Sequence, residues 1–404
     1  MNLSADRLVA ACGDKGSDGG ITIRTVLEPL AGPLAPVKPA IYAGGGFQED
    51  MRWWGTPPER VSAILIDNVP SEANRLEAAL SELRSDLGLP EVVLDLSHIP
   101  GLPPHLPRQL SGFRFPHRQA DAYLRDAVDE KGQPFARTAV GRALLDATAD
   151  NPGAILQWFP QALLFGYWQS HLGSKRSQAK LARSWVSEIV GYAPATEAEG
   201  RTLVLGVKGD VLNLSVSEQA DFDEVDFLDT PWSLVEGSKK EKPAPGQSRK
   251  ALSEIGHGQI VVGGNARSAV SFLAIEQTAT VSFAGLRRIH AATAEASAAA
   301  RALLVALGLR AHVAAFGRPF TLRSGCDLRP AETTWTWRGA ETDEALDALD
   351  GETADRLFKA CRAAAVAAGL LTDGGWGAAP LVLQPSKALT SAISKTWPLA
   401  PVGD

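Results

Sequence analysis

The chain has 404 residues, and its 45% hydrophobic and 21% charged residues provide the material for a sizeable folded core. Its formal net charge of −6 argues against a protein that binds nucleic acid over its whole surface, because such proteins are usually basic. The sequence has no run of about 18 apolar residues and no signal-peptide pattern after Met1, so we expect a cytoplasmic protein without a membrane helix.

The first part of the chain predicts a layer of strands and helices. Alternating β-branched residues indicate a strand over 20–27, and an apolar run indicates a second strand over 60–69. Ser71 would cap the helix that follows, since its hydroxyl can accept a hydrogen bond from the first turn. Residues 91–96 indicate another strand, so this order predicts an α/β or α+β layer. The buried face of the helix would consist of Leu76, Leu80, Leu83 and Leu87.

The middle of the chain is less regular. Residues 100–116 are rich in proline, arginine and histidine and predict an extended excursion, whereas residues 136–149 predict a helix. The apolar and aromatic segment 153–169 predicts one buried helix. A hairpin is expected at 202–216, and the polar, proline-containing segment 237–250 is expected to be flexible.

The last part of the chain again combines strands with helices. A strand is expected near the start of 268–283, and an alanine-rich helix over 291–307. Residues 319–322 and 333–338 predict two further strands, and residues 353–371 predict a second alanine-rich helix.

The sequence lacks the common catalytic signatures. There is no G-x-x-x-x-G-K-[ST], H-E-x-x-H, G-x-S-x-G or C-x-x-C motif. No two of the seven histidines lie four residues apart, and the three cysteines, Cys12, Cys326 and Cys361, are widely separated. We therefore expect no catalytic activity, no bound metal and no cofactor.

A basic stretch after an aromatic segment predicts RNA binding. Cations beside flat rings suit single-stranded RNA, because the charges follow the phosphates while the rings stack on bases. In the alternative interpretation, Trp168 lies in the core and the cations form an ordinary solvated face. The cations of this stretch are Lys175, Arg176, Lys180 and Arg183.

Other cations lie where a phosphate could approach the backbone. Free N–H groups at the start of the helix near Ser71 attract anions, and Asn74 and Arg75 lie in that first part. Alternatively, Arg75 pairs with a neighbouring acid. Two arginine pairs lie close to glycines, although surface salt bridges explain them equally well. They are Arg287 with Arg288, and Arg318 with Arg323.

Several segments together resemble a known family. They are IDNVPSEANRLE at 66–77, LFGYWQSH at 164–171, SEIGHG at 253–258 followed by TVSFAGLRRI at 280–289, and FGRPFTLRSGCDL at 316–328. The resemblance runs from about residue 20 to about residue 385. On these motifs the chain resembles the large backbone subunit of type I-G (formerly I-U) CRISPR Cascade complexes, a member of the RAMP superfamily.

The resemblance implies an α+β fold with a modified RRM-like (ferredoxin-like) palm and long thumb- and finger-like insertions. It implies a single RAMP-type domain over 1–404, with insertion loops at 100–118 and 229–252. Residues 385–404 would form a C-terminal extension.

The resemblance also implies a non-catalytic protein that binds CRISPR RNA. Copies of the chain would stack along the RNA beside other Cascade subunits and present the spacer for pairing with target DNA, without contact to a membrane. The expected RNA contacts, mostly with phosphates, are Asn74, Arg75, Lys175, Arg176, Lys180, Arg183, Arg287, Arg288, Arg318 and Arg323.

Two alternatives remain open at this point. One is a metal-dependent endoribonuclease of the same superfamily that cuts target RNA, for which Asp67 and Asp327 are the candidate carboxylates. Asp67 would otherwise end a strand, and Asp327 would otherwise brace Arg323. The other alternative is a small-molecule enzyme or metabolic scaffold, for which the protein would purify without nucleic acid.

Overall fold

The computed structural model describes most of the chain. The described residues are 2–42, 46–169, 179–195, 269–371 and 376–396, with four short strands between 207 and 261. The chain divides into two compact units, and each is described by itself. The larger unit contains Met1–Ala40, Phe47–Ala195 and Ala269–Asp404, and the smaller contains Ile41–Gly46 and Thr196–Ser268.

The smaller unit contains two short antiparallel strand pairs. β10 (Val207–Lys208) pairs with β13 (Ile260–Val261), and β11 (Val225–Phe227) pairs with β12 (Leu234–Glu236). The expected hairpin at 202–216 therefore contains β10, whose partner is more distant in the sequence. The rest of that hairpin, the segment 237–250 and most of the expected loop at 229–252 lie outside the described residues.

An antiparallel sheet forms the centre of the larger unit. Its strand order is β15-β16-β1-β14-β9-β3-β2, and β17 also pairs with β16. The strands are β1 (Gly20–Pro29), β2 (Glu49–Trp54), β3 (Glu59–Asp67), β9 (Trp185–Pro194), β14 (Phe272–Ser282), β15 (Phe320–Arg323), β16 (Cys326–Arg338) and β17 (Asp343–Leu346). Every one of these pairings is antiparallel.

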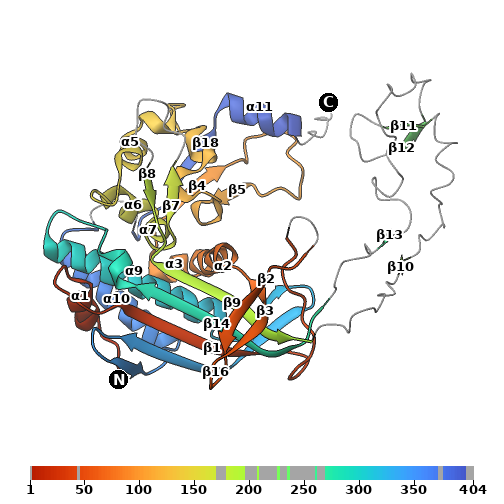
Figure 1. The fold of residues 1–404 in the computed structure, drawn as a ribbon. Coiled ribbons are helices and arrows are strands. Elements are labelled where there is room, and N and C mark those ends of the chain that lie inside the picture. The colour runs from red at the N-terminus through yellow and green to blue at the C-terminus, as the bar shows by residue number, and fades with distance from the viewer. Residues whose placement is uncertain are drawn as a thin grey trace. The chain divides into compact units, whose positions relative to one another are not determined.

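The inner four strands have the order of a ferredoxin-like sheet. In chain order, β1, α2 (Val69–Glu82), β9, β14, α9 (Ala294–Phe316) and β16 form a β-α-β-β-α-β series, and these strands lie in the order β16-β1-β14-β9. The hairpin of β2 and β3 extends the sheet beyond β9. Figure 1 shows α2 and α9 on the same side of this sheet. The expected α+β, RRM-like fold is confirmed.

The main core lies between the sheet and a layer of helices around α9. Helices α1 (Ala5–Cys12) and α10 (Gly351–Ala367) both pack on α9. Alternate residues of β1, such as Ile21 and Ile23, are buried under this layer because side chains of a strand alternate between its two faces. Within the described part, α9 alone is long and apolar enough to span a membrane, but 83% of that stretch is buried in the fold.

A second, smaller sheet combines three strands from between α2 and β9 with one strand from near residue 383. Its strand order is β5-β4-β18-β6, and β18, from the C-terminal end, lies parallel to β4. A helix, α11 (Lys387–Thr396), follows β18. The strands are β4 (Val92–Asp95), β5 (Gln109–Ser111), β6 (Ala127–Val128) and β18 (Leu381–Pro385). The expected insertion at 100–118 thus includes β5, and its role as an insertion stays a prediction.

Short helices and one more strand pair complete this part. They are α3 (Arg84–Leu87), η1 (Gly112–Arg114), η2 (Arg118–Ala120), α4 (Ala122–Arg125), η3 (Phe135–Arg137), α5 (Ala139–Asp146), α6 (Gly153–Trp158), α7 (Pro160–Phe165), β7 (Tyr167–Gln169) and β8 (Ala179–Leu181). β7 pairs with β8 in an antiparallel pair. The expected helices at 136–149 and 353–371 correspond to α5 and α10, with shorter bounds.

Two expectations about helices were wrong. The cap of α2 is Asn68 instead of Ser71: its Oδ1 accepts a hydrogen bond from the Ser71 N–H at 2.9 Å. Pro70 therefore lies inside the first turn, where its missing N–H costs nothing. The segment 153–169 forms α6, α7 and β7 instead of one helix. Pro160 begins α7, and Gly166, with φ of 81°, ends it in a conformation that favours glycine.

Candidate nucleic-acid interface

A groove of about 780 Å³ lies where η2, the end of α7, β7, β8 and the start of β9 meet. We call it the arginine groove. Its lining includes His117, Arg118, Phe165, Trp168, Arg183 and Val186. Two arginines and an exposed tryptophan thus face one concave surface, although they come from three separate segments of the chain.

Arg118 is firmly anchored at one side of the groove. It donates two hydrogen bonds to the Glu77 carboxylate, at 2.7 and 2.8 Å, and a third to the Gly166 carbonyl at 3.1 Å. Burial raises the pKa of Glu77, and the positive charge of Arg118 partly offsets this rise. The backbone of Arg118 has a φ of 53°, which is uncommon outside glycine, so these contacts hold a strained residue in place.

Arg183 carries a charge that is less well compensated. Its Nε donates to the Phe165 carbonyl at 3.2 Å, and no carboxylate within the described residues forms an ion pair with it. Burial lowers the pKa of Arg183, the positive charge of Arg118 lowers it further, and the charge of Glu77 raises it in part. An arginine stays protonated all the same, so a phosphate entering the groove would relieve the repulsion between these two cations.

The β7–β8 pair presents an aromatic ring beside a lysine. Trp168 is 62% exposed, and its strand partner in β8 is the exposed Lys180. The alternative interpretation, in which Trp168 lies in the core, is therefore wrong. Trp168 lies on a strand, and its neighbours Tyr167 and Gln169 are the buried residues of that strand. An exposed aromatic ring can stack on a base, while neighbouring cations bind the phosphates of the same strand.

Arg288 lies beside the same strand pair. Its guanidinium donates to the Gly285 carbonyl at 3.0 Å and to the Ala182 carbonyl at 3.2 Å. The Arg288 guanidinium therefore lies against the backbone between Lys180 and Arg183, and its contact with RNA stays a prediction. Lys175 and Arg176 lie outside the described residues.

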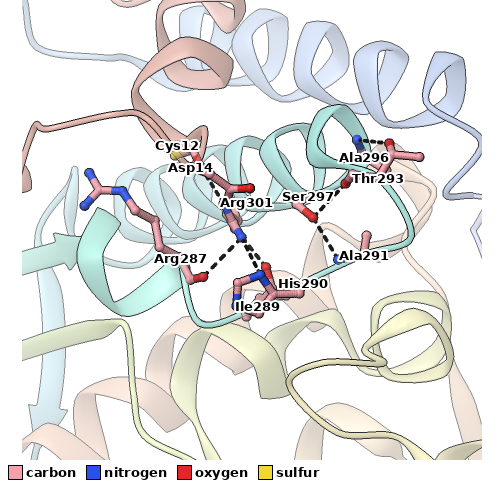
Figure 2. A network of polar contacts seen from close by, with 10 residues as sticks. All are labelled: Cys12, Asp14, Arg287, Ile289, His290, Ala291, Thr293, Ala296, Ser297 and Arg301. Atoms are coloured by element: carbon pink, nitrogen blue, oxygen red, sulfur yellow. Dashed lines mark hydrogen bonds and ion pairs between the residues drawn. The ribbon is translucent and has the colours of Figure 1, made fainter.

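Arg287 points to a different part of the fold, and Figure 2 shows how its loop is held. Arg301 of α9 has no exposed surface and donates to the carbonyls of Arg287, Ile289 and Cys12 at 3.1, 2.8 and 3.0 Å. It also pairs with Asp14 at 2.7 Å, while Arg287 donates to the Asp18 carbonyl at 2.6 Å. Sequence analysis did not single out Arg301, although an arginine within an alanine-rich helix was the available signal.

Arg75 and Arg323 share one buried carboxylate. Arg75 Nε lies 2.7 Å from Asp67 Oδ2, and Arg323 Nη2 lies 2.9 Å from Asp67 Oδ1. Arg75 therefore has the neighbouring acid that the alternative interpretation expected. Arg323 is braced by Asp67, whereas Asp327 accepts a hydrogen bond from Thr321 at 2.5 Å, so the expected Asp327–Arg323 brace was wrong. Phosphate contact by either arginine stays a prediction.

Asn74 and Arg318 are both exposed. Asn74 lines a second groove of about 450 Å³ together with Phe113 and Arg114, and Pro116 lines both this groove and the arginine groove. The two grooves therefore adjoin. Arg318 follows the end of α9 and does not line either of them.

The carboxylates considered for metal binding are engaged elsewhere. Asp67, which ends β3 as expected, is 1% exposed and bound by two arginines. Among the described residues, no group of three or more histidine, cysteine, aspartate or glutamate side chains could hold a metal ion.

Comparison with known proteins adds one finding. No curated protein matches the chain. Residues 21–195, which run from β1 through α2 and the arginine groove to β9, match the model of a family described as CRISPR-associated protein GSU0053. In this part, the chain is similar to a CRISPR-associated protein.

Proposed function

We propose that this chain is a non-catalytic subunit that binds CRISPR RNA and forms the backbone of a type I-G Cascade complex. Copies of the chain would line up along the guide RNA, next to other Cascade subunits in the cytoplasm, and present the spacer for pairing with target DNA. The observation that carries the proposal is the arginine groove, which is lined by Arg118, Arg183 and the exposed Trp168, with Lys180 opposite Trp168 in the β7–β8 pair. The match to a CRISPR-associated family supports the same context.

The negative total charge does not oppose this proposal. Surface charges act over a Debye length of roughly 8–10 Å at physiological salt, so a local groove can attract phosphate while other faces carry the acid. In the groove, Glu77 forms its ion pair with Arg118, and the same carboxylate is the only acid that raises the pKa of Arg183. Two arginines thus depend on one carboxylate, and a phosphate would supply a second negative charge.

The test is a salt titration of RNA binding by the full chain. In a Lys180→Ala/Arg183→Ala variant, we expect binding of a CRISPR RNA to weaken on the order of tenfold or more at moderate salt, since a hydrogen bond to a charged group contributes about 1.5–3 kcal/mol. The slope of log affinity against log salt should fall by about 0.7 for each lost phosphate contact. Spacers of different sequence should be affected alike, because phosphates carry no sequence information.

A matched control replaces an exposed arginine and an exposed lysine elsewhere. Arg356→Ala/Lys359→Ala on α10 removes the same total charge without touching the groove. The proposal requires that this control keeps the wild-type salt slope. An equal loss in both variants would mean that only net charge matters, and an unchanged slope in the groove variant would overturn the assigned site.

A further inference from the structure

A buried glutamate lies between helix α2 and the main sheet. Glu72, in the first turn of α2, has no exposed surface, although most of the buried face of this helix is apolar. Its Oε2 accepts a hydrogen bond at 2.6 Å from Nε2 of Gln277 in β14, which is also fully buried. Its Oε1, like the Oγ of the buried Ser187 in β9, has no hydrogen-bond partner among the described residues. The hydrogen bond that holds this carboxyl group thus comes from a neutral amide.

The cations of this region are used by another acid. Arg75 and Arg323 both bind Asp67, at 2.7 and 2.9 Å, and Asp67 is itself 1% exposed. The two arginine side chains are 27% and 23% exposed, so water hydrates part of each positive charge. Within the described residues, no cation forms an ion pair with Glu72. A charged Glu72 would therefore lie close to a second buried acid without a cation of its own.

The surroundings of Glu72 disfavour its charged form. The charged groups that act on it are Asp67, at the end of β3, and Arg75, on α2 itself; helix α9, strand β9 and η1 also pack against α2, and their described residues add none. Burial raises the pKa of Glu72 to about 8, and the negative charge of Asp67 adds to the rise. Gln277, Ser187 and Arg75 offset it only in part. The start of α2 favours a negative charge, but this effect is much smaller than the cost of removing a carboxylate from water.

We propose that Glu72 keeps its proton in the folded chain at neutral pH, and that the loss of this proton at alkaline pH weakens the packing of α2 on the sheet. A neutral carboxyl group needs no cation, and its O–H can donate a hydrogen bond to the nearby Ser187 Oγ, which is otherwise unpaired. A carboxylate in the same place would be a buried charge without compensation. The same helix carries Glu77, which anchors Arg118, so this proton acts on the helix that holds one side of the arginine groove.

The direction of the pH dependence follows from the folded and unfolded states of Glu72. The unfolded chain has the ordinary glutamate pKa of about 4.5, so between pH 4.5 and 8 the folded chain holds a proton that the unfolded chain has released. The contribution of Glu72 to stability should therefore fall as the pH rises through this range, and it should be lost above about pH 8. Below pH 6.5 the buried His312 changes stability in the opposite direction, so the test begins at pH 6.5.

The test compares the wild type with Glu72→Gln, whose amide is uncharged at every pH. Chemical denaturation of the full chain at pH 6.5 and at pH 9 gives the folding equilibrium constant of each protein. Between these two pH values, the constant of the wild type should fall on the order of tenfold more than that of Glu72→Gln, because only the wild type loses the proton. Glu82→Gln, at an exposed position of the same helix, is the matched control and should change with pH like the wild type.

Two further measurements locate the proton and its effect. The infrared difference spectrum between the wild type and Glu72→Gln should contain the carbonyl band of a neutral carboxylic acid at pH 6.5 and lose it at pH 9. Hydrogen exchange in α2 of the wild type, relative to Glu72→Gln at the same pH, should become faster from pH 6.5 to pH 9, while exchange in α10 changes less.

Each alternative result would overturn the inference. A stability difference between the wild type and Glu72→Gln that stays constant with pH, or a carboxylate band at pH 6.5, would mean that Glu72 is ionised. Equal acceleration of exchange in α2 and α10 would mean that the proton stabilises the whole fold instead of the packing of α2. A Glu72→Gln chain that does not fold at any pH would also contradict a neutral Glu72, because its amide has nearly the size of the protonated acid and no charge. These readouts need no RNA, so they do not depend on the proposed function.

Discussion

Arg301 is a fully buried cation held mainly by backbone carbonyls. Three of its partners are the carbonyls of Cys12, Arg287 and Ile289, and the half-exposed Asp14 supplies its counter-charge. The fold fixes the positions of backbone carbonyls. Because these carbonyls come from two segments, the Arg301 side chain joins the end of α1 to the loop after α8 (Phe283–Leu286). Figure 2 shows that this loop begins with Arg287 and continues to the start of α9. The position of the cations in the loop thus depends on a residue that faces the core.

Replacing Arg301 should destabilise the fold. Arg301→Met has a similar volume but leaves three buried carbonyls without donors, so we expect the free energy of unfolding to fall by about 3–5 kcal/mol. Chemical denaturation would measure this loss. Arg356→Met, at an exposed position on α10, should change stability by no more than about 0.5 kcal/mol. A loss below about 1 kcal/mol in Arg301→Met would mean that Arg301 does not hold α1 and this loop together.

For single residues, the sequence indicated where charges gather but not which side chains are buried or paired. It indicated four cations after an aromatic segment, and of these the fold places Lys180 opposite Trp168 and Arg183 in the same groove as Trp168. It could not separate them from Arg75, because an acid eight residues earlier, Asp67, becomes its partner only when β3 and α2 pack.

Helix α9 contacts the sheet through a histidine among aromatic rings. His312 lies 5.9 Å from Trp185, 6.1 Å from Trp335 and 5.6 Å from Phe316, measured between ring centroids. Its Nδ1 has no partner among the described residues, and burial lowers the pKa of His312 to about 4. The imidazole is therefore neutral at physiological pH and packs as an aromatic ring.

This burial predicts a pH dependence of stability. The unfolded chain has a histidine pKa of about 6.5, so between pH 6.5 and 4 the unfolded state binds more protons than the folded state. Stability should thus fall as the pH is lowered through this window, by roughly 3 kcal/mol for a pKa difference of this size. His312→Phe keeps an aromatic ring but cannot bind a proton. The part of the pH dependence of its stability that comes from His312 should therefore disappear. Chemical denaturation of the wild type and of His312→Phe at pH 7.5, 5.5 and 4 would measure this difference. If the free energy of unfolding fell equally with pH in both proteins, His312 would not be its source.

Regular elements with one buried face were predictable, and interrupted ones were not. The alternation in β1 and the leucine spacing of α2 each indicated the right type of element. The segment 153–169 has helical composition throughout, but Pro160 and Gly166 divide it, and a period of apolar residues does not reveal such breaks. Because Trp168 follows Gly166, misplacing this break also misplaced the ring.

At the scale of the whole molecule, the C-terminal strand completes a sheet formed early in the sequence. β18 lies between β4 and β6, and Leu383 in its centre is 1% exposed. The order of strands along the chain could not reveal this pairing, since parallel strands far apart in sequence leave no local pattern. The RRM-like order of the main sheet was accessible only through the family resemblance, for the same reason.

Leu383 therefore provides a test of how the small sheet is held. Leu383→Ala removes buried methyl groups and should cost about 2–5 kcal/mol of stability, with the loss seen first in the small sheet. Hydrogen exchange should show faster exchange in β4 and β6 than in β1 and β14. Val366→Ala, at an exposed position in α10, is the control and should leave all four strands unchanged. Uniform acceleration in all strands of Leu383→Ala would instead mean that both sheets unfold as one unit.

The parallel pairing of β18 with β4 has a consequence for biosynthesis. A ribosome releases β4 long before β18, so the edge of β4 that β18 covers stays unpaired while the residues between them are synthesised. Open strand edges recruit other strands, so we expect non-native strand pairing to be most favourable in this interval. The small sheet can close only after β18 has emerged, so a product truncated before β18 would have an incomplete small sheet.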